Sequence, residues 1–193
     1  MVIVILPSEF EMKVCGKKEL EDLGAKVFSF GMGKVRGIYA CHRAVKRIRK
    51  MGEPVSHIIL GGFCGSLSAD LKTGDAVQGN LFYEMDYKNP FDNPERGIER
   101  GGERLLPNVK QAIFFCQDKF IEDSKGLWRS VACDMESYAV AYFCQQEKIP
   151  FSVIKIVSDV ANADAGNEFA KNTVRYGRKM TETLKEAVKN VQK

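Results

Sequence analysis

Three acidic residues of this sequence, Glu11, Glu136 and Asp159, lie where a carboxylate could do chemistry. Two or three carboxylates around a dry cleft can cleave a glycosidic bond. One with a raised pKa protonates the leaving group, another activates water, and a third can hold sugar hydroxyls. Each carboxylate could instead cap a helix or turn, because carboxylates accept the free backbone N–H groups found there.

Glu136 is the hardest of the three to explain structurally. It lies in ACDMESYAVAYF (Ala132–Phe143), where apolar residues recur at helical spacing and predict a helix with one buried face. That stripe comprises Met135, Tyr138, Ala139, Tyr142 and Phe143. Asp134 is expected to be the N-cap of this helix. Glu136 then lies beside the buried stripe, where a carboxylate could face a cleft.

Two further motifs contain residue types that could bind a cofactor or act as a nucleophile. The stretch GMGKVRG (Gly31–Gly37) resembles a dinucleotide-binding loop, but its third glycine is out of register and close helix–sheet packing is favoured. Cys64, in GGFCGS, could be a nucleophile on a turn, but a cysteine nucleophile needs a base. The sequence has two histidines, His42 on a predicted helix and His57 at the far end of the preceding strand, so a small residue fitting a tight turn is favoured.

Composition narrows the class of protein. The chain has 193 residues, 45% hydrophobic and 28% charged, which predicts one globular domain spanning residues 1–193. We expect no membrane span, because no run of 18 apolar residues occurs. The N-terminal MVIVILPSEFE is interpreted as a first strand rather than a signal peptide.

Charge and cysteine content suggest neither nucleic acid nor a metal. The net charge is only +4, and the basic run HRAVKRIRK (His42–Lys50) is interpreted as the solvated face of a helix rather than a phosphate-binding surface. The six cysteines are scattered without a C-x-x-C pair, so no zinc site is predicted. Reduced thiols and no secretory leader together predict a cytoplasmic protein.

Alternating strands and helices position the candidate residues. Strands are predicted at Val2–Leu6, Lys26–Phe30, His57–Leu60, Gln111–Phe115 and Phe151–Asp159, with further β-like stretches at GDAVQG and LFYEMD. Helices are predicted at about Glu11–Leu23, from the glycine stretch to about Met51, after Asp134, and at about Asn167–Val191, and a surface loop at about Lys88–Asn108. This order predicts a single-domain, three-layer α/β/α fold with a central mixed, mostly parallel sheet. Ligands of such folds bind beyond the carboxyl ends of the strands.

The same motifs, taken together, resemble those of the nucleoside phosphorylase/nucleosidase superfamily. The similarity covers GMGKVRGIYA, GGFCGSLSADLKTGDAV, CQDKFI and DMESYAVAYFCQQEKIPFSVIKIVSDVA, in that order along the chain. Within that superfamily, this sequence most resembles the methylthioadenosine/S-adenosylhomocysteine nucleosidases. The most specific parts are D-M-E at the helix start and S-D-V-A after the last strand. The resemblance implies hydrolysis of a purine nucleoside, without a metal or organic cofactor, by a homodimeric enzyme.

The resemblance also implies a role for each candidate residue. Asp159 would protonate the purine at N7, oriented by Ser158, and Glu11 would activate the attacking water. Glu136 would bind the ribose 2′- and 3′-hydroxyls, with Met135 packing under the sugar. On the base side, Phe120 would stack on the purine and the backbone of Ile121 would bond its edge.

Two positions bear on the choice of nucleophile. Phosphorylases of the superfamily hold phosphate with arginines and a serine, and one pair of these residues flanks the glycine loop, where this sequence has Leu60 and Phe63. A phosphate dianion needs paired charge and donors, which these side chains lack, so water is the expected nucleophile. Phe63 also stands where the nucleosidases that this sequence resembles usually have a small polar residue. It is therefore expected to reshape the sugar pocket. Phosphorolysis, a different nucleoside such as a futalosine-like one, and a non-catalytic nucleoside-binding relative remain the alternatives.

Overall fold

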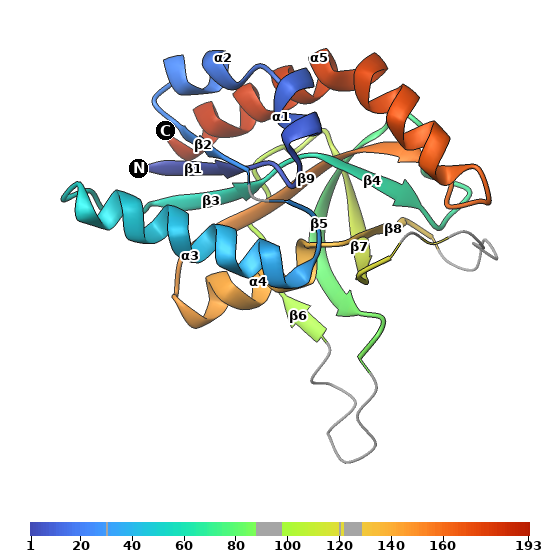
Figure 1. The fold of residues 1–193 in the computed structure, drawn as a ribbon, viewed down its shortest axis with the longest axis horizontal. Helices are drawn as coiled ribbons and strands as arrows, with labels where there is room; N and C mark the ends of the chain where they lie inside the picture. Colours follow the sequence, from blue (N-terminus) through green and yellow to red (C-terminus); the bar gives the residue numbers. More distant parts are fainter. Residues whose placement is uncertain (30, 88–97, 120, 122–128) are drawn as a thin grey trace.

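The computed structural model describes residues 1–193 except 30, 88–97, 120 and 122–128 (Figure 1). The strands are β1 (Val2–Ile5), β2 (Lys26–Phe28), β3 (His57–Leu60), β4 (Phe63–Ser66), β5 (Ala76–Glu84), β6 (Ile98–Arg100), β7 (Lys110–Cys116), β8 (Val131–Asp134) and β9 (Phe151–Asp159). The helices are α1 (Glu9–Val14), α2 (Lys17–Asp22), α3 (Lys34–Lys50), α4 (Ser137–Gln146) and α5 (Ala165–Val191).

The strands form one mixed sheet in the order β2-β1-β3-β9-β4-β8-β7-β5-β6, and β9 pairs with β5 as well. That additional pairing closes β9, β4, β8, β7 and β5 into a ring. The pairs β1–β2, β1–β3, β3–β9, β4–β9, β7–β8 and β5–β7 are parallel, while β4–β8, β5–β9 and β5–β6 are antiparallel. The predicted mixed, mostly parallel sheet is therefore confirmed.

Helices cover the sheet on two sides, which gives the expected three layers. In Figure 1, α1, α2 and α5 lie on one side and α3 and α4 on the other. Val4 and Ile59 face the first group, with Leu184 of α5 in the same cluster, whereas Ile3 and Ile58 belong to the cluster that contains the buried side of α3. The period of two along the strands sends neighbouring side chains into opposite layers, so both faces are apolar.

The strand and helix predictions hold for the long apolar segments and fail locally elsewhere. The single helix predicted at about Glu11–Leu23 is wrong, because the chain forms α1 and α2 with a break at Cys15 and Gly16. The backbone N–H of Gly16 donates to Thr181 Oγ1 of α5 at 2.8 Å, and this bond replaces the helical one. The break lets the two short helices follow the surface of α5.

The beginning of α4 also differs from the prediction. Its N-cap is Glu136, whose side chain makes no capping bond, and Asp134 is the last residue of β8. Asp134 still caps the helix indirectly, since its carboxylate accepts from the Ser137 backbone and hydroxyl at 3.1 and 2.6 Å. The predicted apolar stripe is only partly buried, because Tyr142 is 43% exposed while Val140 and Cys144 are buried.

The sequence did not predict β4, β6 or β8. β6 lies within the predicted loop at Lys88–Asn108 and pairs with β5, while residues 88–97 of that loop lie outside the described residues. GDAVQG and LFYEMD contribute to one continuous strand, β5. Among the helices that the structure describes, none has the length and apolar character needed to cross a membrane.

Candidate active site

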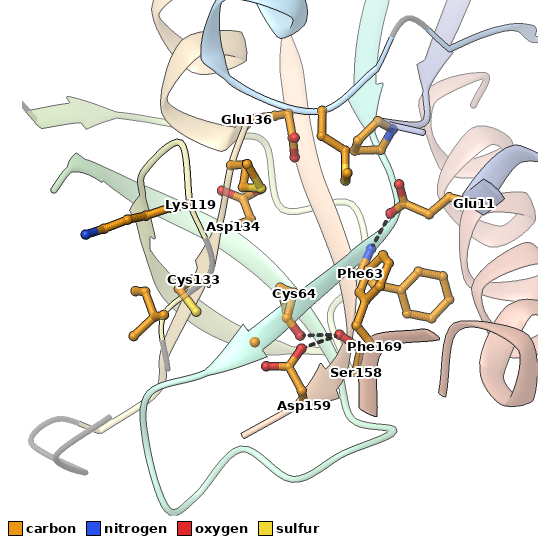
Figure 2. A pocket seen from close by; sticks show the side chains of 15 residues that line it. Glu11, Phe63, Cys64, Lys119, Cys133, Asp134, Glu136, Ser158, Asp159 and Phe169 are labelled. Carbon is orange, nitrogen blue, oxygen red and sulfur yellow. Dashed lines mark hydrogen bonds between the residues drawn. The ribbon is translucent and has the colours of Figure 1, made fainter. Parts of the chain in front are cut away.

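One cavity is lined by residues of β4, of the ends of β8 and β9, and of the segment after β1 (Figure 2). Its empty volume is about 530 Å³, which includes open solvent at its mouth. It is lined by Pro7, Glu11, Met32, Phe63, Cys64, Gly65, Lys119, Ile121, Cys133, Asp134, Met135, Glu136, Ser158, Asp159 and Phe169. Figure 2 shows the carboxylates of Glu11, Glu136 and Asp159 approaching it from separate walls.

Glu11 is fixed by the start of α1. Ser8 and Glu11 form a capping box, in which Ser8 Oγ accepts from the Glu11 backbone and the Ser8 backbone donates to Glu11 Oε2 at 2.9 Å. The Ser8 hydroxyl donates to Oε2 at 2.7 Å, and the backbone of Phe63 donates to Oε1 at 3.0 Å. Burial raises the pKa of Glu11, while Lys155 and these donors oppose the rise.

Two glycines of the GGFCG stretch make room for the carboxylates. A Cβ at Gly62 would lie 2.5 Å from Glu11 Oε1, and the φ of +120° at this residue disfavours any side chain. A Cβ at Gly65 would lie 2.7 Å from Asp159 Oδ1. The glycines therefore allow the backbone of this stretch to approach both acids closely.

Glu136 lies between two helix starts. Its Oε1 accepts from the backbone of Gly33, the N-cap of α3, at 2.8 Å, so the positive end of that helix faces the carboxylate. Its Oε2 lies 3.7 Å from Lys155 Nζ. Burial raises the pKa of Glu136 to about 8, with the negative charges of Asp134 and Glu11 adding to the rise and Lys155 opposing it.

Lys155 is a fully buried cation in the middle of β9. Its Nζ lies 3.3 Å from Asp134 Oδ2 as well as near Glu136, but neither contact has hydrogen-bond geometry. Burial favours the neutral amine, yet the carboxylates of Asp134, Glu136 and Glu11 outweigh it and raise the pKa of Lys155. The lysine therefore stays charged and holds several carboxylates in one buried cluster.

Asp159 closes β9 and lies 3% exposed. The Ser158 hydroxyl donates to Asp159 Oδ2 at 2.7 Å and lies 3.1 Å from the carbonyl of Cys64 (Figure 2). Asp159 Oδ1 accepts from the Ala161 backbone at 3.0 Å. Burial raises the pKa of Asp159 despite these two donors, so the acid retains its proton to a higher pH than an exposed aspartate.

An aromatic wall separates Glu11 from Asp159. Phe63 of β4 packs edge-to-face on Phe169 of α5, with ring centroids 6.5 Å apart and planes at 89°. Phe169 also contacts Phe10 of α1 at 6.4 Å. These rings make the surface between the two acids apolar and uncharged.

The structure brings most of the predicted residues together. Seven of the eight line the cavity, while Phe120 lies outside the described residues. The seven are Glu11, Phe63, Ile121, Met135, Glu136, Ser158 and Asp159. Sequence reasoning missed the roles of Lys155 and Asp134. A lysine within the apolar run VIKIV was the available signal, because an isolated charge in a buried strand needs partners.

The cysteine hypothesis receives no support from the geometry. No histidine lines the cavity in the part of the chain that the structure describes. His57 lies on β3 with Ser152 and Glu103 as its neighbours. Burial raises the pKa of Cys64 well above its ordinary value, so the thiol stays neutral. Within the described ranges, no three His, Cys, Asp or Glu side chains are arranged to hold a metal ion.

Comparison with known proteins identifies the enzyme family to which this fold belongs. The family model described as the phosphorylase superfamily matches residues 22–189, and the chain belongs to that superfamily. Among curated relatives, the 5′-methylthioadenosine/S-adenosylhomocysteine nucleosidase of Thermotoga maritima is 27% identical over 188 residues, covering 90% of this chain and 81% of the relative. The aminodeoxyfutalosine nucleosidase of Helicobacter pylori is 24% identical, covering 76% of this chain and 78% of the relative.

Solved structures show the same fold. A 5′-methylthioadenosine/S-adenosylhomocysteine nucleosidase of Helicobacter pylori, in complex with butyl-thio-DADMe-Immucillin-A, matches with a TM-score of 0.80 at 20% identity, covering 97% of both chains. The nucleosidase of Neisseria meningitidis, in complex with methylthio-immucillin-A, matches with a TM-score of 0.78 at 22% identity, covering 97% of this chain and 98% of that one. The predicted superfamily and fold class are therefore confirmed.

Proposed function

We propose that this chain hydrolyses the N-glycosidic bond of a purine nucleoside whose ribose carries a 5′ substituent, and releases the free base. The observation that carries this proposal is the convergence of Glu11, Glu136 and Asp159, all buried, on one cavity. The nucleosidase relatives support the same chemistry. We treat residues 1–193 as one nucleosidase domain.

Asp159 is the general acid of this mechanism. A purine leaves more readily once protonated, so the acid must hold a proton at working pH. Burial raises the pKa of Asp159, which shifts this carboxyl toward the protonated form that the role needs. Ser158 and the Ala161 backbone hold one carboxyl oxygen each, which fixes the plane of the carboxyl group toward the base.

Glu11 is the residue that activates water. Its two oxygens are already held by Ser8 and the Phe63 backbone, so the carboxylate cannot turn away from the cavity. Proton abstraction requires the ionised form. Burial raises the pKa of Glu11, and Lys155 and these donors oppose that rise. The departing base leaves a cation-like sugar that the activated water attacks.

Glu136 and Met135 hold the sugar. A carboxylate can accept from two neighbouring hydroxyls, so Glu136 suits the ribose 2′,3′-diol, and Met135 supplies an apolar surface beneath the ring. On the base side, Ile121 offers its backbone groups, and Phe120 completes the set proposed from the sequence.

Water rather than phosphate is the proposed nucleophile. Lys119 is the cation that lines the described cavity, and the wall between Glu11 and Asp159 consists of Phe63 and Phe169. A phosphate dianion there would face two carboxylates and an aromatic surface without paired donors. Phosphorolysis is the second candidate, because the superfamily is named for it.

The test is release of free base by the purified protein. Methylthioadenosine, S-adenosylhomocysteine and aminodeoxyfutalosine are the first substrates to try, since the relatives bear these names. We expect equal release with and without phosphate, and none from Asp159→Asn. Release only with phosphate would establish phosphorolysis instead. Tight nucleoside binding without release, and unchanged in Asp159→Asn, would identify a binding protein.

We further propose that the protein is a homodimer and that it resides in the cytoplasm. Large apolar side chains are exposed on α3 and α4, among them Val35 at 79%, Tyr39 at 55% and Tyr142 at 43%. Sedimentation should give the dimer mass, and Tyr142→Glu should shift it toward the monomer. Val174→Glu, on the opposite helical layer, is the matched control.

The proposed location in the cytoplasm is supported by the six cysteines, which are free and buried and therefore suit a reducing compartment. Cell fractionation tests this location.

A further inference from the structure

β9 contains an irregularity next to the proposed acid. In its pairing with β4, Cys64 faces Val157 while the next residue, Gly65, faces Asp159. Ser158 is therefore an extra residue in the ladder, a β-bulge without a partner on β4. Bulges bend a strand and re-aim side chains, and they leave a residue whose backbone must bond elsewhere.

Two side chains of α5 form hydrogen bonds with the backbone around the bulge. Asn172, buried on that helix, donates its side-chain amide to the Ser158 carbonyl at 2.8 Å. One turn earlier, Glu168 Oε2 accepts from the backbone of Val160 at 3.3 Å. Residues four apart share a helical face, so one side of α5 bonds the chain immediately before and immediately after Asp159.

We propose that Asn172 and Glu168 are positioning residues that hold the Ser158 bulge, and with it the Asp159 carboxyl, in the geometry needed for proton transfer. This inference rests on the proposed function. Neither residue lines the cavity, so both act through Asp159 rather than on the substrate.

Glu168 adds an electrostatic role to the positional one. Its negative charge raises the pKa of Asp159, after the larger effect of burial. Among the residues that the structure describes, the other titratable groups that interact with Asp159 are the thiols of Cys64 on β4 and Cys133 on β8. Burial raises the pKa of both thiols, so they remain neutral and Glu168 supplies the negative charge.

The first experiment separates positioning from folding. Asn172→Leu keeps the four-atom, branched side chain and removes the donor, and we expect kcat to fall about tenfold or more with little change in KM, as for a displaced catalytic group. Asn190→Leu is the matched control, because Asn190 of the same helix donates an equivalent bond to the Leu105 carbonyl at 2.9 Å, away from the cavity. Equal kcat in the two variants, at equal thermal stability, would overturn the role of Asn172.

The second experiment isolates the charge of Glu168. Glu168→Gln keeps an acceptor for Val160 and removes the charge, so the pKa of Asp159 should fall. The alkaline limb of the pH profile of kcat/KM should then move to lower pH. Glu186 is exposed on the same helix, so Glu186→Gln is the control and should leave this limb in place. An unmoved limb in Glu168→Gln would refute this part.

A third readout needs no turnover. The pKa of the Asp159 carboxyl can be followed by NMR in the free protein, and we expect it to be lower in Glu168→Gln than in the wild type. A wild-type protein that releases no base would refute the proposed function alone, because the NMR titration would still support or contradict the effect of Glu168. An active wild type with unchanged variants would refute the positioning role alone.

Discussion

Replacing Lys155 by Met should be among the most destabilising single changes in this chain. Lys155 is fully buried, 3.3 Å from Asp134 and 3.7 Å from Glu136. Met has a similar length and fits the apolar part of the site, but it leaves the carboxylates without their cation. Removing one partner of a buried ion pair typically costs about 3–5 kcal/mol, because the other charge stays buried.

The pH dependence of that loss has a definite sign. The pKa of Glu136 is raised from 4.5 to about 8 in the folded protein, so wild-type stability from this group is full below pH 4.5 and is lost as pH rises through about 8. Lys155 lowers the pKa of Glu136, so Lys155→Met raises it further. Above about pH 8 the wild type ionises Glu136 beside Lys155 while the variant keeps the proton, and the stability difference must widen.

Urea unfolding of both proteins at about pH 6 and about pH 9 gives the two free energies of unfolding needed. Lys110→Met is the matched control, since Lys110 is 53% exposed and pairs with Asp75 at 2.8 Å on the surface. Such exposed pairs contribute about 0–1 kcal/mol. A loss for Lys155→Met no larger than this control, or a difference that narrows above pH 8, would refute the buried-cluster argument.

Further predictions concern the proposed acids. Gly62→Ala should lower kcat and the melting temperature, because its Cβ would lie 2.5 Å from Glu11 Oε1 and its φ of +120° adds about 1–3 kcal/mol of strain. Ser158→Ala should move the alkaline limb of kcat/KM to higher pH, since the Ser158 hydroxyl lowers the pKa of Asp159; a shift to lower pH would contradict this. Glu136→Gln should weaken discrimination between ribo- and 2′-deoxynucleosides in calorimetry at about pH 9, where Glu136 is ionised, because a bond to a charged group contributes about 1.5–3 kcal/mol and the Gln amide carries no charge. Equal discrimination in both proteins would exclude Glu136 as the diol ligand.

The sequence predicted the parts of the fold in which one signal dominates. β1, β3 and β9 are continuous apolar runs, and α5 has a clear stripe, so burial alone determines them. β4 (FCGS) and β8 (VACD) were missed because, unlike β1 and β3, they contain few large aliphatic residues and are held by pairing within the ring. Such non-local pairing leaves no periodic signal in a short segment.

The proposed acids could be located from the sequence, but their environment could not. Asp159 follows an apolar strand, and Glu11 follows another at the distance that a capping box requires. The role of Lys155 was missed, because a sequence cannot show that Asp134 and Glu136 meet this side chain from the end of β8 and the start of α4. The Ser158 bulge was equally invisible, since it exists only in the register between two strands.

The closed ring of β9, β4, β8, β7 and β5 has a consequence for how the protein is made. β9 follows the other four in the sequence, and it pairs with β3, β4 and β5. A nascent chain that has not yet emerged beyond Phe151 therefore has an open row of strands, without Lys155 to neutralise its acids and without Asp159. Emergence of β9 then closes the ring and adds Lys155 and the proposed acid together, so a chain that still lacks β9 cannot carry out the proposed reaction.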